Sequence, residues 1–283
     1  MPTNEQNHQD EASDSHVKPG GGSKRVGPGT VRVVAGAEGC DEAVAAGAVA
    51  LMVDALRASA TITALTSAGA GTIFVATHVE QARRVKEQIG DVLLIGEREG
   101  FPPEGFDAGN SPAEVLGLGV VGRQIGFTST TGAARLGQLR GAPAILVGGP
   151  VNASAVVEAA VRLAGGGGHP VYAIAAGLTG RPGGTEEDWL GAALLAQGLA
   201  ARGYDWINRD EHMNEHWPAH LTPENVREGF FAGGHGRSLV EKGLGDDITD
   251  CSRVDWLPVV AQVIGYREID DGPPVAELKP LDG

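Results

Sequence analysis

The chain is poor in cysteine and has no long hydrophobic run. Its 283 residues include only two cysteines, Cys40 and Cys251, which are too few for a disulfide framework and favour a reducing compartment. No apolar run approaches the roughly 18 residues of a transmembrane helix, and the polar N-terminus does not resemble a secretion signal. We therefore expect a cytoplasmic protein with no membrane partner.

Basic and aromatic residues are also scarce. The 22 lysines and arginines are outnumbered by 36 acidic residues, which gives a formal net charge of −14. Nucleic acids and anionic membranes bind basic faces, so neither is an expected partner, whereas a small anionic substrate meets only the charges of its own site. Aromatic residues make up 5% of the chain, and its 44 glycines favour tight turns between strands and helices over an all-β sandwich.

Several catalytic signatures are missing as well. Neither cysteine begins a Cys-x₅-Arg nucleophile loop, Asp54 is not part of an Asp-x-Asp pair, and no Arg-His-Gly occurs, so a covalent phosphoenzyme has no obvious carrier. His212, Glu215 and His216 match a zinc-peptidase pattern. Because Pro218 would interrupt the helix that this pattern requires, zinc chemistry is not expected there.

The composition of the chain changes near both ends. Residues 1–28 are polar with almost nothing to bury and are predicted to form a disordered tail. Residues 29–268 are expected to form one α/β domain, or two sub-lobes of it, with an irregular polar segment at 204–235. Residues 269–283 are expected to be a loose C-terminal tail.

Short apolar runs alternate with helical patterns from residue 30 onward. The predicted strands are Val31–Val34, Val49–Val53, Thr72–Ala76, Val92–Ile95, Gln124–Thr128, Ala144–Val147, Val171–Ala175 and Trp256–Val263. The predicted helices include Val79–Gln88, Ala113–Leu118, Ser154–Leu163, Glu186–Ala201 and Ser238–Leu244. Continuous apolar runs are typical of strands covered on both faces. The fold class is therefore expected to be α/β, with an open, largely parallel sheet flanked by helices on both faces and ligands bound beyond the carboxyl ends of its strands.

Charged residues follow the strand at Val92–Ile95. The loop from Gly96 to Pro112 carries three carboxylates, a guanidinium and an amide, which belong to Glu97, Glu99, Asp107, Arg98 and Asn110. It ends in a helix start, since Ser111 and Glu114 have the spacing of a capping box and Pro112 suits a first turn. Such a loop either binds a ligand or is a solvated surface loop.

A second candidate loop follows the strand at Val49–Val53. Asp54 stands at the strand end, where a carboxylate suits Mg²⁺, and Arg57 could hold an anionic group in a bidentate fork. Ser59 lies near the start of the next helix. The alternative is that Asp54 merely caps this helix and Arg57 lies on the surface.

Hydroxyl-rich and glycine-rich turns follow three further strands. Thr128, Ser129, Thr130 and Thr131 precede Gly132 in a plausible phosphate cradle that is not a Walker loop, although an ordinary helix cap would also fit.

Asn152 follows another strand and is a better candidate for capping than for ligand contact. Arg181 lies in the turn after Val171–Ala175, ahead of Glu187 and Asp188, which are either metal ligands or acids that complement the helix dipole.

Taken together, these motifs resemble the 2-phosphosulfolactate phosphatase family over about residues 30–262. The matching segments are Asp54-Ala-Leu-Arg57-Ala-Ser59, Gly96-Glu97-Arg98, Phe106-Asp107-Ala-Gly109-Asn110-Ser111-Pro112, the Thr128–Gly132 loop, Asn152-Ala-Ser, Glu187-Asp188, and a closing segment with Ser238-Leu239 and Asp247-Ile248. The resemblance implies an α/β phosphatase that hydrolyses 2-phospho-3-sulfolactate to 3-sulfolactate and phosphate with Mg²⁺, a step toward coenzyme M.

The sequence departs from the family pattern in the loops. A Thr-Thr-Thr-Asn-Gly-Thr segment becomes Thr-Ser-Thr-Thr131-Gly-Ala133, which loses an amide and a hydroxyl, and Gly-Glu-Arg-Gly-Gly gains the negative charge of Glu99. Cys-Ala-Gly-Thr becomes Ala175-Ala-Gly-Leu178. These changes affect the identity of the substrate more than the class of reaction.

The resemblance and the motifs assign a role to each candidate. Asp54, Glu97 and Asp107 are the candidates for Mg²⁺ binding or water activation, and Glu187 is a further candidate metal ligand. The substrate-binding candidates are Arg57, Ser59, Arg98, Asn110, Thr128, Ser129, Thr130, Thr131, Gly132, Asn152 and Arg181.

Two alternatives stay open. The first is a phosphatase of the same fold that acts on a different phosphoester, and the second is a paralogue that binds an anionic metabolite without turning it over. A homodimer is the default expectation for a soluble enzyme.

Overall fold

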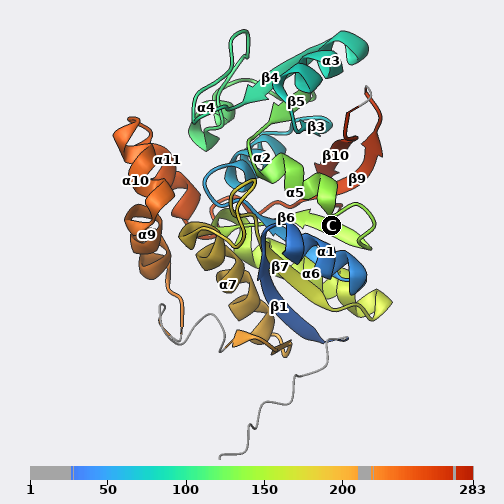
Figure 1. Ribbon diagram of the computed structural model, residues 1–283, viewed down its shortest axis with the longest axis vertical. Coiled ribbons are helices and arrows are strands. Elements are labelled where there is room, and N and C mark those ends of the chain that lie inside the picture. Colours follow the sequence, from blue (N-terminus) through green and yellow to red (C-terminus); the bar gives the residue numbers. More distant parts are fainter. Residues whose placement is uncertain (1–26, 28, 210–217, 219, 270–271, 283) are drawn as a thin grey trace, which may run out of the picture.

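The computed structural model describes residues 27, 29–209, 218, 220–269 and 272–282 (Figure 1). The predicted N-terminal tail, apart from residue 27, and the zinc-like pattern at 212–216 lie outside the described residues.

The described strands form a single ten-stranded sheet. The strands are β1 (Thr30–Ala35), β2 (Val49–Val53), β3 (Ile73–Ala76), β4 (Val92–Gly96), β5 (Gln124–Thr128), β6 (Ala144–Val147), β7 (Val171–Ala175), β8 (Asp205–Trp206), β9 (Ala261–Arg267) and β10 (Val275–Pro280). Their order is β4-β5-β3-β10-β9-β6-β2-β7-β1-β8. Strands β1 to β8 pair in parallel, and only β9 and β10 run antiparallel to their neighbours. The predicted α/β class with a largely parallel sheet is confirmed.

Helices alternate with these strands. They are α1 (Gly36–Ala45), α2 (Ala58–Ser67), α3 (Val79–Ile89), α4 (Pro112–Leu116), α5 (Gly132–Gln138), α6 (Ala153–Gly167), α7 (Glu186–Ala200), α9 (Pro223–Ala232), α10 (Gly234–Glu241) and α11 (Gly245–Ser252), with a short 3₁₀ turn at Pro150–Asn152. Helices α1 and α5 pack against each other, as do α6 and α7, and both pairs contact the β1, β2 and β7 region. Because these strands are covered on both faces, β2 and β7 are buried along their whole length.

The C-terminal segment differs from its predicted state. Instead of a loose tail, residues 275–280 form β10, which pairs with β3 on one side and β9 on the other. Val275 and Leu278 are completely buried. The segment is short, contains two charged residues and ends in proline, so its strand character comes from pairing with distant residues rather than from its own pattern.

The segment at 204–235 also contains regular structure. Helix α9 begins at Pro223, where Thr222 accepts a hydrogen bond from the Asn225 N–H and the Asn225 side chain accepts one from the Thr222 N–H. Helix α10 follows after a single glycine. Figure 1 shows α9, α10 and α11 grouped on one side of the molecule, where α9 contacts α7 and α11 contacts α4.

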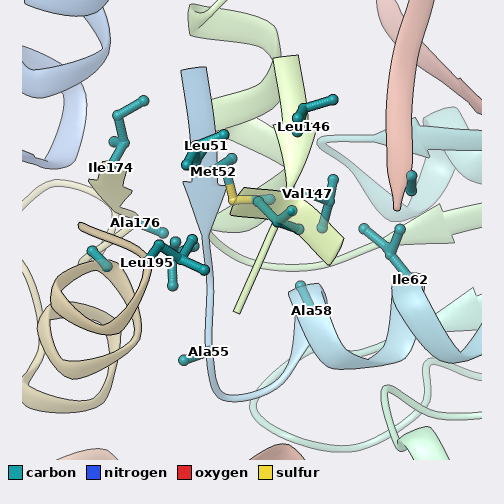
Figure 2. Packing of buried hydrophobic residues seen from close by; sticks show 14 of the residues in the cluster. Leu51, Met52, Ala55, Ala58, Ile62, Leu146, Val147, Ile174, Ala176 and Leu195 are labelled. Atoms are coloured by element: carbon teal, nitrogen blue, oxygen red, sulfur yellow. The ribbon is translucent and has the colours of Figure 1, made fainter. Parts of the chain in front are cut away.

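A tightly packed core lies behind the loop that joins β2 to α2. Figure 2 shows Leu51 and Met52 of β2 packed with residues of β6, β7 and α7, while Ala55 and Ala58 flank the loop itself. Both alanines are buried, so the loop that carries Asp54 is anchored at each end. Among the described helices, none combines the length and the apolar character needed to cross a bilayer.

Candidate active site

A polar cavity of about 180 Å³ lies beyond the carboxyl ends of the parallel strands. Its lining comes from the loops after β2, β4, β5 and β7, from the first turn of α7, and from α10 and the residue that follows it. The lining residues are Asp54, Leu56, Arg57, Glu97, Glu99, Gly100, Asn110, Ser129, Thr130, Thr131, Gly177, Leu178, Asp188, His235, Leu239 and Lys242. In the sheet, β4 and β5 lie on one side of β9 and β10, and β2 and β7 lie on the other side. The cavity therefore combines residues from loops that follow strands on both sides.

Asp54 lies in the wall of this cavity and is 8% exposed. Its backbone N–H donates to Ser59 Oγ at 3.0 Å, its Oδ1 accepts a long hydrogen bond, of 3.4 Å, from the Ala58 N–H, and the Gly132 N–H also donates to the carboxylate. Burial raises the pKa of Asp54 to about 6, and the charge of Glu97 adds to this effect while His235 opposes it. The carboxylate is therefore a weak helix cap that faces other charged groups.

Glu97 follows β4 and is held by three donors. Its Oε2 accepts from the Gly100 N–H at 2.9 Å, and its Oε1 accepts from the N–H and the hydroxyl of Thr130, both at 2.8 Å. Burial alone would raise the pKa of Glu97, but these hydrogen bonds and the charge of Arg98 lower it overall. Glu97 is thus an ionised carboxylate with a fixed orientation that joins the loops after β4 and β5.

The hydroxyl loop lies beside Asp54. Ser129, Thr130 and Thr131 line the cavity, whereas Thr128 donates its hydroxyl to Ala76 O at 2.8 Å and is fully buried. Gly132 permits a close approach, because a Cβ at this position would lie 2.7 Å from Asp54 Oδ2. The absence of a side chain there lets the start of α5 contact the carboxylate directly.

Arg57 is a buried cation in the cavity wall. One nitrogen of its guanidinium pairs with Asp247 of α11 at 2.5 Å, and the other donates to Gly100 O at 2.6 Å. The second oxygen of Asp247 accepts from the Ser111 hydroxyl at 2.6 Å. One carboxylate therefore ties the loop after β2, the start of α4 and the C-terminal helices together.

A third acidic group lies where α7 begins. Asp188 accepts hydrogen bonds from the Ala55 N–H at 2.7 Å and the Gly177 N–H at 2.9 Å, and burial together with the charges of Glu187 and Asp54 raises its pKa well above the ordinary value. Glu187 is buried, and its Oε1 lies 2.9 Å from His235 Nδ1. Burial lowers the pKa of His235, but the bond to Glu187 and the charges of Glu187 and Asp54 raise it overall.

Seven of the fifteen predicted site residues line the cavity. Those that do are Asp54, Arg57, Glu97, Asn110, Ser129, Thr130 and Thr131. Ser59, Arg98, Thr128, Gly132 and Glu187 lie immediately behind them and hold them by the contacts described above; Arg98 donates to Glu97 O, Thr77 O and Thr128 Oγ1.

The structure places three predicted residues away from the cavity lining. Asp107 lies along the edge of β4, where its carboxylate accepts from the Leu94 N–H at 2.7 Å and lies 3.7 Å from Lys86. Asn152 is completely buried and bonds to the main chain at Gly149, Val147 and Val259.

Arg181 is exposed in the turn after β7. None of these three has the position that a ligand-binding role in this cavity requires.

The lining also includes residues that sequence reasoning did not select. His235 and Leu239 lie on α10, Lys242 caps its C-terminal end, and Asp247 lies just behind the wall. His235, Leu239 and Lys242 are spaced at i, i+4 and i+7, which places them on one face of a helix. This spacing is the feature of the sequence that could have identified them as a group. It was hidden because the predicted helix began at Ser238, four residues after α10 begins.

The cavity fits a divalent cation through its carboxylates. No group of three or more His, Cys, Asp or Glu in the described part of the chain could hold a metal ion by itself. Mg²⁺, however, takes one or two protein carboxylates and completes its shell with water and substrate phosphate. Asp54 and Glu97 are the carboxylates that could hold such a cation, since both line the cavity and the charge of Glu97 contributes to the raised pKa of Asp54.

Comparison with known proteins gives a consistent result. A family model described as 2-phosphosulpholactate phosphatase matches residues 37–265. A probable 2-phosphosulfolactate phosphatase of Deinococcus radiodurans is 35% identical over 231 residues, which cover 79% of this chain and 91% of that protein. Proteins with the same description from Carboxydothermus hydrogenoformans and Thermotoga petrophila are 30% and 31% identical, over 75% and 76% of this chain and 84% and 88% of their own lengths.

The match extends from α1 to β9 and so includes every strand whose following loop lines the cavity. The chain therefore belongs to the 2-phosphosulfolactate phosphatase family, a family of probable phosphatases.

Proposed function

We propose that this protein hydrolyses 2-phospho-3-sulfolactate to 3-sulfolactate and phosphate with the help of Mg²⁺. The observation that carries the proposal is the single cavity in which Asp54 and Glu97 lie beside the hydroxyls of Ser129 and Thr130 and the guanidinium of Arg57. Family membership and the descriptions of the relatives support the same reaction.

The size and charge of the cavity suit a small, highly anionic ester. A volume of about 180 Å³ is below the range of sites for drug-sized ligands and matches a three-carbon metabolite. The phosphoryl group would lie next to Asp54, where the hydroxyl loop and the start of α5 supply donors to its oxygens. Arg57 would hold one of the other anionic groups of the substrate.

Asp54 and Glu97 would hold the cation. When bound, Mg²⁺ neutralises phosphoryl oxygens and favours attack by water. His235 lies in the same cavity, and Glu187 favours its protonated form, so its imidazolium would donate a proton to the ester oxygen that leaves with 3-sulfolactate. Asp188, which is held by two backbone N–H groups, would keep the loops after β2 and β7 together.

Phosphate release by the purified full-length chain tests this proposal. We expect release from 2-phospho-3-sulfolactate with Mg²⁺ and loss of release with a chelator. Asp54→Asn should lower kcat by about a hundredfold or more, since charge stabilisation at a phosphoryl group is the main catalytic effect. Asp107→Asn is the matched control, and because Asp107 lies outside the cavity we expect it to keep most of its activity. Unchanged turnover in Asp54→Asn would contradict the proposed site.

A second candidate is hydrolysis of a different phosphoester by the same site. Glu99 lines the cavity and adds a negative charge that disfavours a substrate with three anionic groups. A panel of small phosphoesters separates the candidates, because phosphate release only from other esters would favour this one. Binding of 3-sulfolactate without turnover of any ester would instead indicate a non-catalytic metabolite-binding protein.

A further inference from the structure

Helix α10 contributes one face to the cavity. His235, Leu239 and Lys242 follow each other at helical spacing, and all three line the cavity. The other charged lining residues come from loops after the strands, apart from Asp188 in the first turn of α7. The C-terminal helices therefore supply part of the wall and do more than cover the domain.

Lys242 is the cation of this face that has no acidic partner among the described residues. Its Nζ donates to the backbone carbonyl of Glu99 at 2.9 Å, and no ion pair involves it within the described part of the chain. Arg57, by contrast, is already paired with Asp247. A charged donor whose acceptor is a neutral carbonyl gains by exchanging it for an anion.

Lys242 and Arg57 bind the same stretch of the loop after β4. The two side chains bind consecutive carbonyls, since Lys242 binds Glu99 O and Arg57 binds Gly100 O. A Cβ at Gly100 would lie 3.7 Å from Lys242 Nζ. This end of the cavity therefore combines two cations on one loop. Glu97 lies between this loop and the hydroxyl loop, since it accepts from both Gly100 and Thr130, whereas Asp54 lies beside Gly132 at the start of α5.

We propose that Lys242 forms a subsite for the second strong-acid group of the substrate, the sulfonate, next to the carboxylate-binding Arg57. The proposal rests on the proposed function, because it takes the phosphoryl group to lie at Asp54. A sulfonate spreads its charge over three oxygens and accepts hydrogen bonds from an ammonium without a fixed angle, which suits a flexible lysine. Lys242 is thereby a specificity-determining residue rather than a catalytic one.

The test compares two substrates that differ only at this group. 2-Phospho-3-sulfolactate carries the sulfonate, and 2-phosphoglycerate carries a hydroxyl in its place. We expect Lys242→Met to raise KM for the sulfonated ester by about tenfold to a hundredfold, the range of a lost charged hydrogen bond, with a smaller change in kcat. The kcat/KM for 2-phosphoglycerate should change less than about threefold, and Lys242→Arg should restore most of the affinity for the sulfonated ester.

The variant is suited to this test because Lys242 is exposed and its loss should not unfold the chain. Lys279→Met, at an exposed position on β10, is the matched control. Equal losses on both substrates, or no loss on either, would overturn the subsite while leaving the proposed function intact.

Calorimetric binding of 3-sulfolactate decides the question independently of turnover. The wild type should bind it about tenfold or more tightly than Lys242→Met. If the wild type turns over only other phosphoesters, the proposed function fails, but this difference in binding would still support the subsite. Equal binding by both proteins, or none by the wild type, would overturn it.

Discussion

At the scale of single residues, Asp247 is a buried side chain that joins three separate segments around the site. It bonds both Arg57 and Ser111 and lies on a helix that is far from both in the chain. It does not line the cavity, so we regard it as a positioning residue for Arg57. Its effect on the reaction should therefore appear through Arg57 rather than through the chemistry itself.

Removing this carboxylate should affect both stability and substrate affinity. Asp247→Ala leaves a buried guanidinium without its counter-ion, which costs about 3–5 kcal/mol in the free energy of unfolding. KM should rise more than kcat falls, because Arg57 would hold the substrate rather than react with it. Urea denaturation and steady-state kinetics measure the two effects. Asp246→Ala changes an exposed neighbour on the same helix, and an equal effect there would contradict the assignment.

The loop after β4 shows why sequence could not separate the acidic candidates. Glu97 and Asp107 both follow the strand in a charged segment, and both have the same side-chain chemistry. In the structure, the chain returns alongside β4, so that the Asp107 N–H donates to Leu94 O and Ala108 pairs with Ile95. Asp107 therefore lies beside the strand, whereas Glu97 lies at its end. Only the path of the loop distinguishes them.

At the scale of elements, the junction of α9 and α10 sets the direction of the α10 face. A Cβ at Gly236 would lie 1.8 Å from Phe230 O, so the two helices approach through a position that only glycine allows. His235 precedes this glycine, and Leu239 and Lys242 follow it on the same face. The approach of the helices thus fixes three cavity residues at once.

Gly236→Ala should displace α10 and impair the site. We expect kcat/KM to fall by about tenfold or more, since small displacements of binding groups have large effects on turnover, and the melting temperature to fall as well. Gly245→Ala is the control, because its Cβ would make an ordinary contact of 3.6 Å with Val240. Circular dichroism melting and kinetics provide the measurements, and a fully active Gly236→Ala would show that α10 does not depend on this contact.

The strands that the sequence predicted are those with their own apolar pattern. Val49–Val53, Gln124–Thr128, Ala144–Val147 and Val171–Ala175 have the predicted bounds because continuous apolar runs must be buried on both faces. Strand β10 could not be found in this way, since Glu277 and Lys279 interrupt it and its burial depends on β3 and β9.

The same limit applies to the site. The loops at strand ends were predictable from the α/β pattern, whereas the contribution of α10 depends on how helices distant in the chain pack.

Strand β10 should therefore contribute strongly to stability. Leu278→Ala removes a fully buried side chain between two strands and should lower the free energy of unfolding by about 2–5 kcal/mol. Lys279→Ala, next to it but exposed, should change it by less than about 0.5 kcal/mol. Denaturation by guanidinium chloride measures both, and equal stability of the two variants would mean that this strand is not part of the folded core.

At the scale of the whole molecule, all three tyrosines are placed so that ionisation is disfavoured. Burial raises the pKa of Tyr172 to about 12, and its hydrogen bond to Glu42 adds to the effect. Burial also raises the pKa values of Tyr204 and Tyr266. The chain contains no other tyrosine, so the effect can be measured without mutation.

The folded protein should resist tyrosine ionisation and lose stability in alkali. An unfolded tyrosine ionises near pH 10, and since the folded pKa values are higher, their contribution to stability is complete below that pH and is lost as the pH rises above it. Phenolate absorbance should appear at higher pH in the native protein than in urea. Superimposed titration curves would contradict the burial of these residues.

Completion of the sheet depends on β9 and β10, which are the last of the described strands to be synthesised. The strands β4, β5 and β3 form one part of the sheet, β6, β2, β7, β1 and β8 form the other, and the described strands that join them are β9 and β10 (Figure 1). On the ribosome, both parts are made before the strands that connect them, so β3 and β6 are left with open edges that can pair with other chains. The growing chain thus completes the sheet that carries the cavity only when its last described strands emerge.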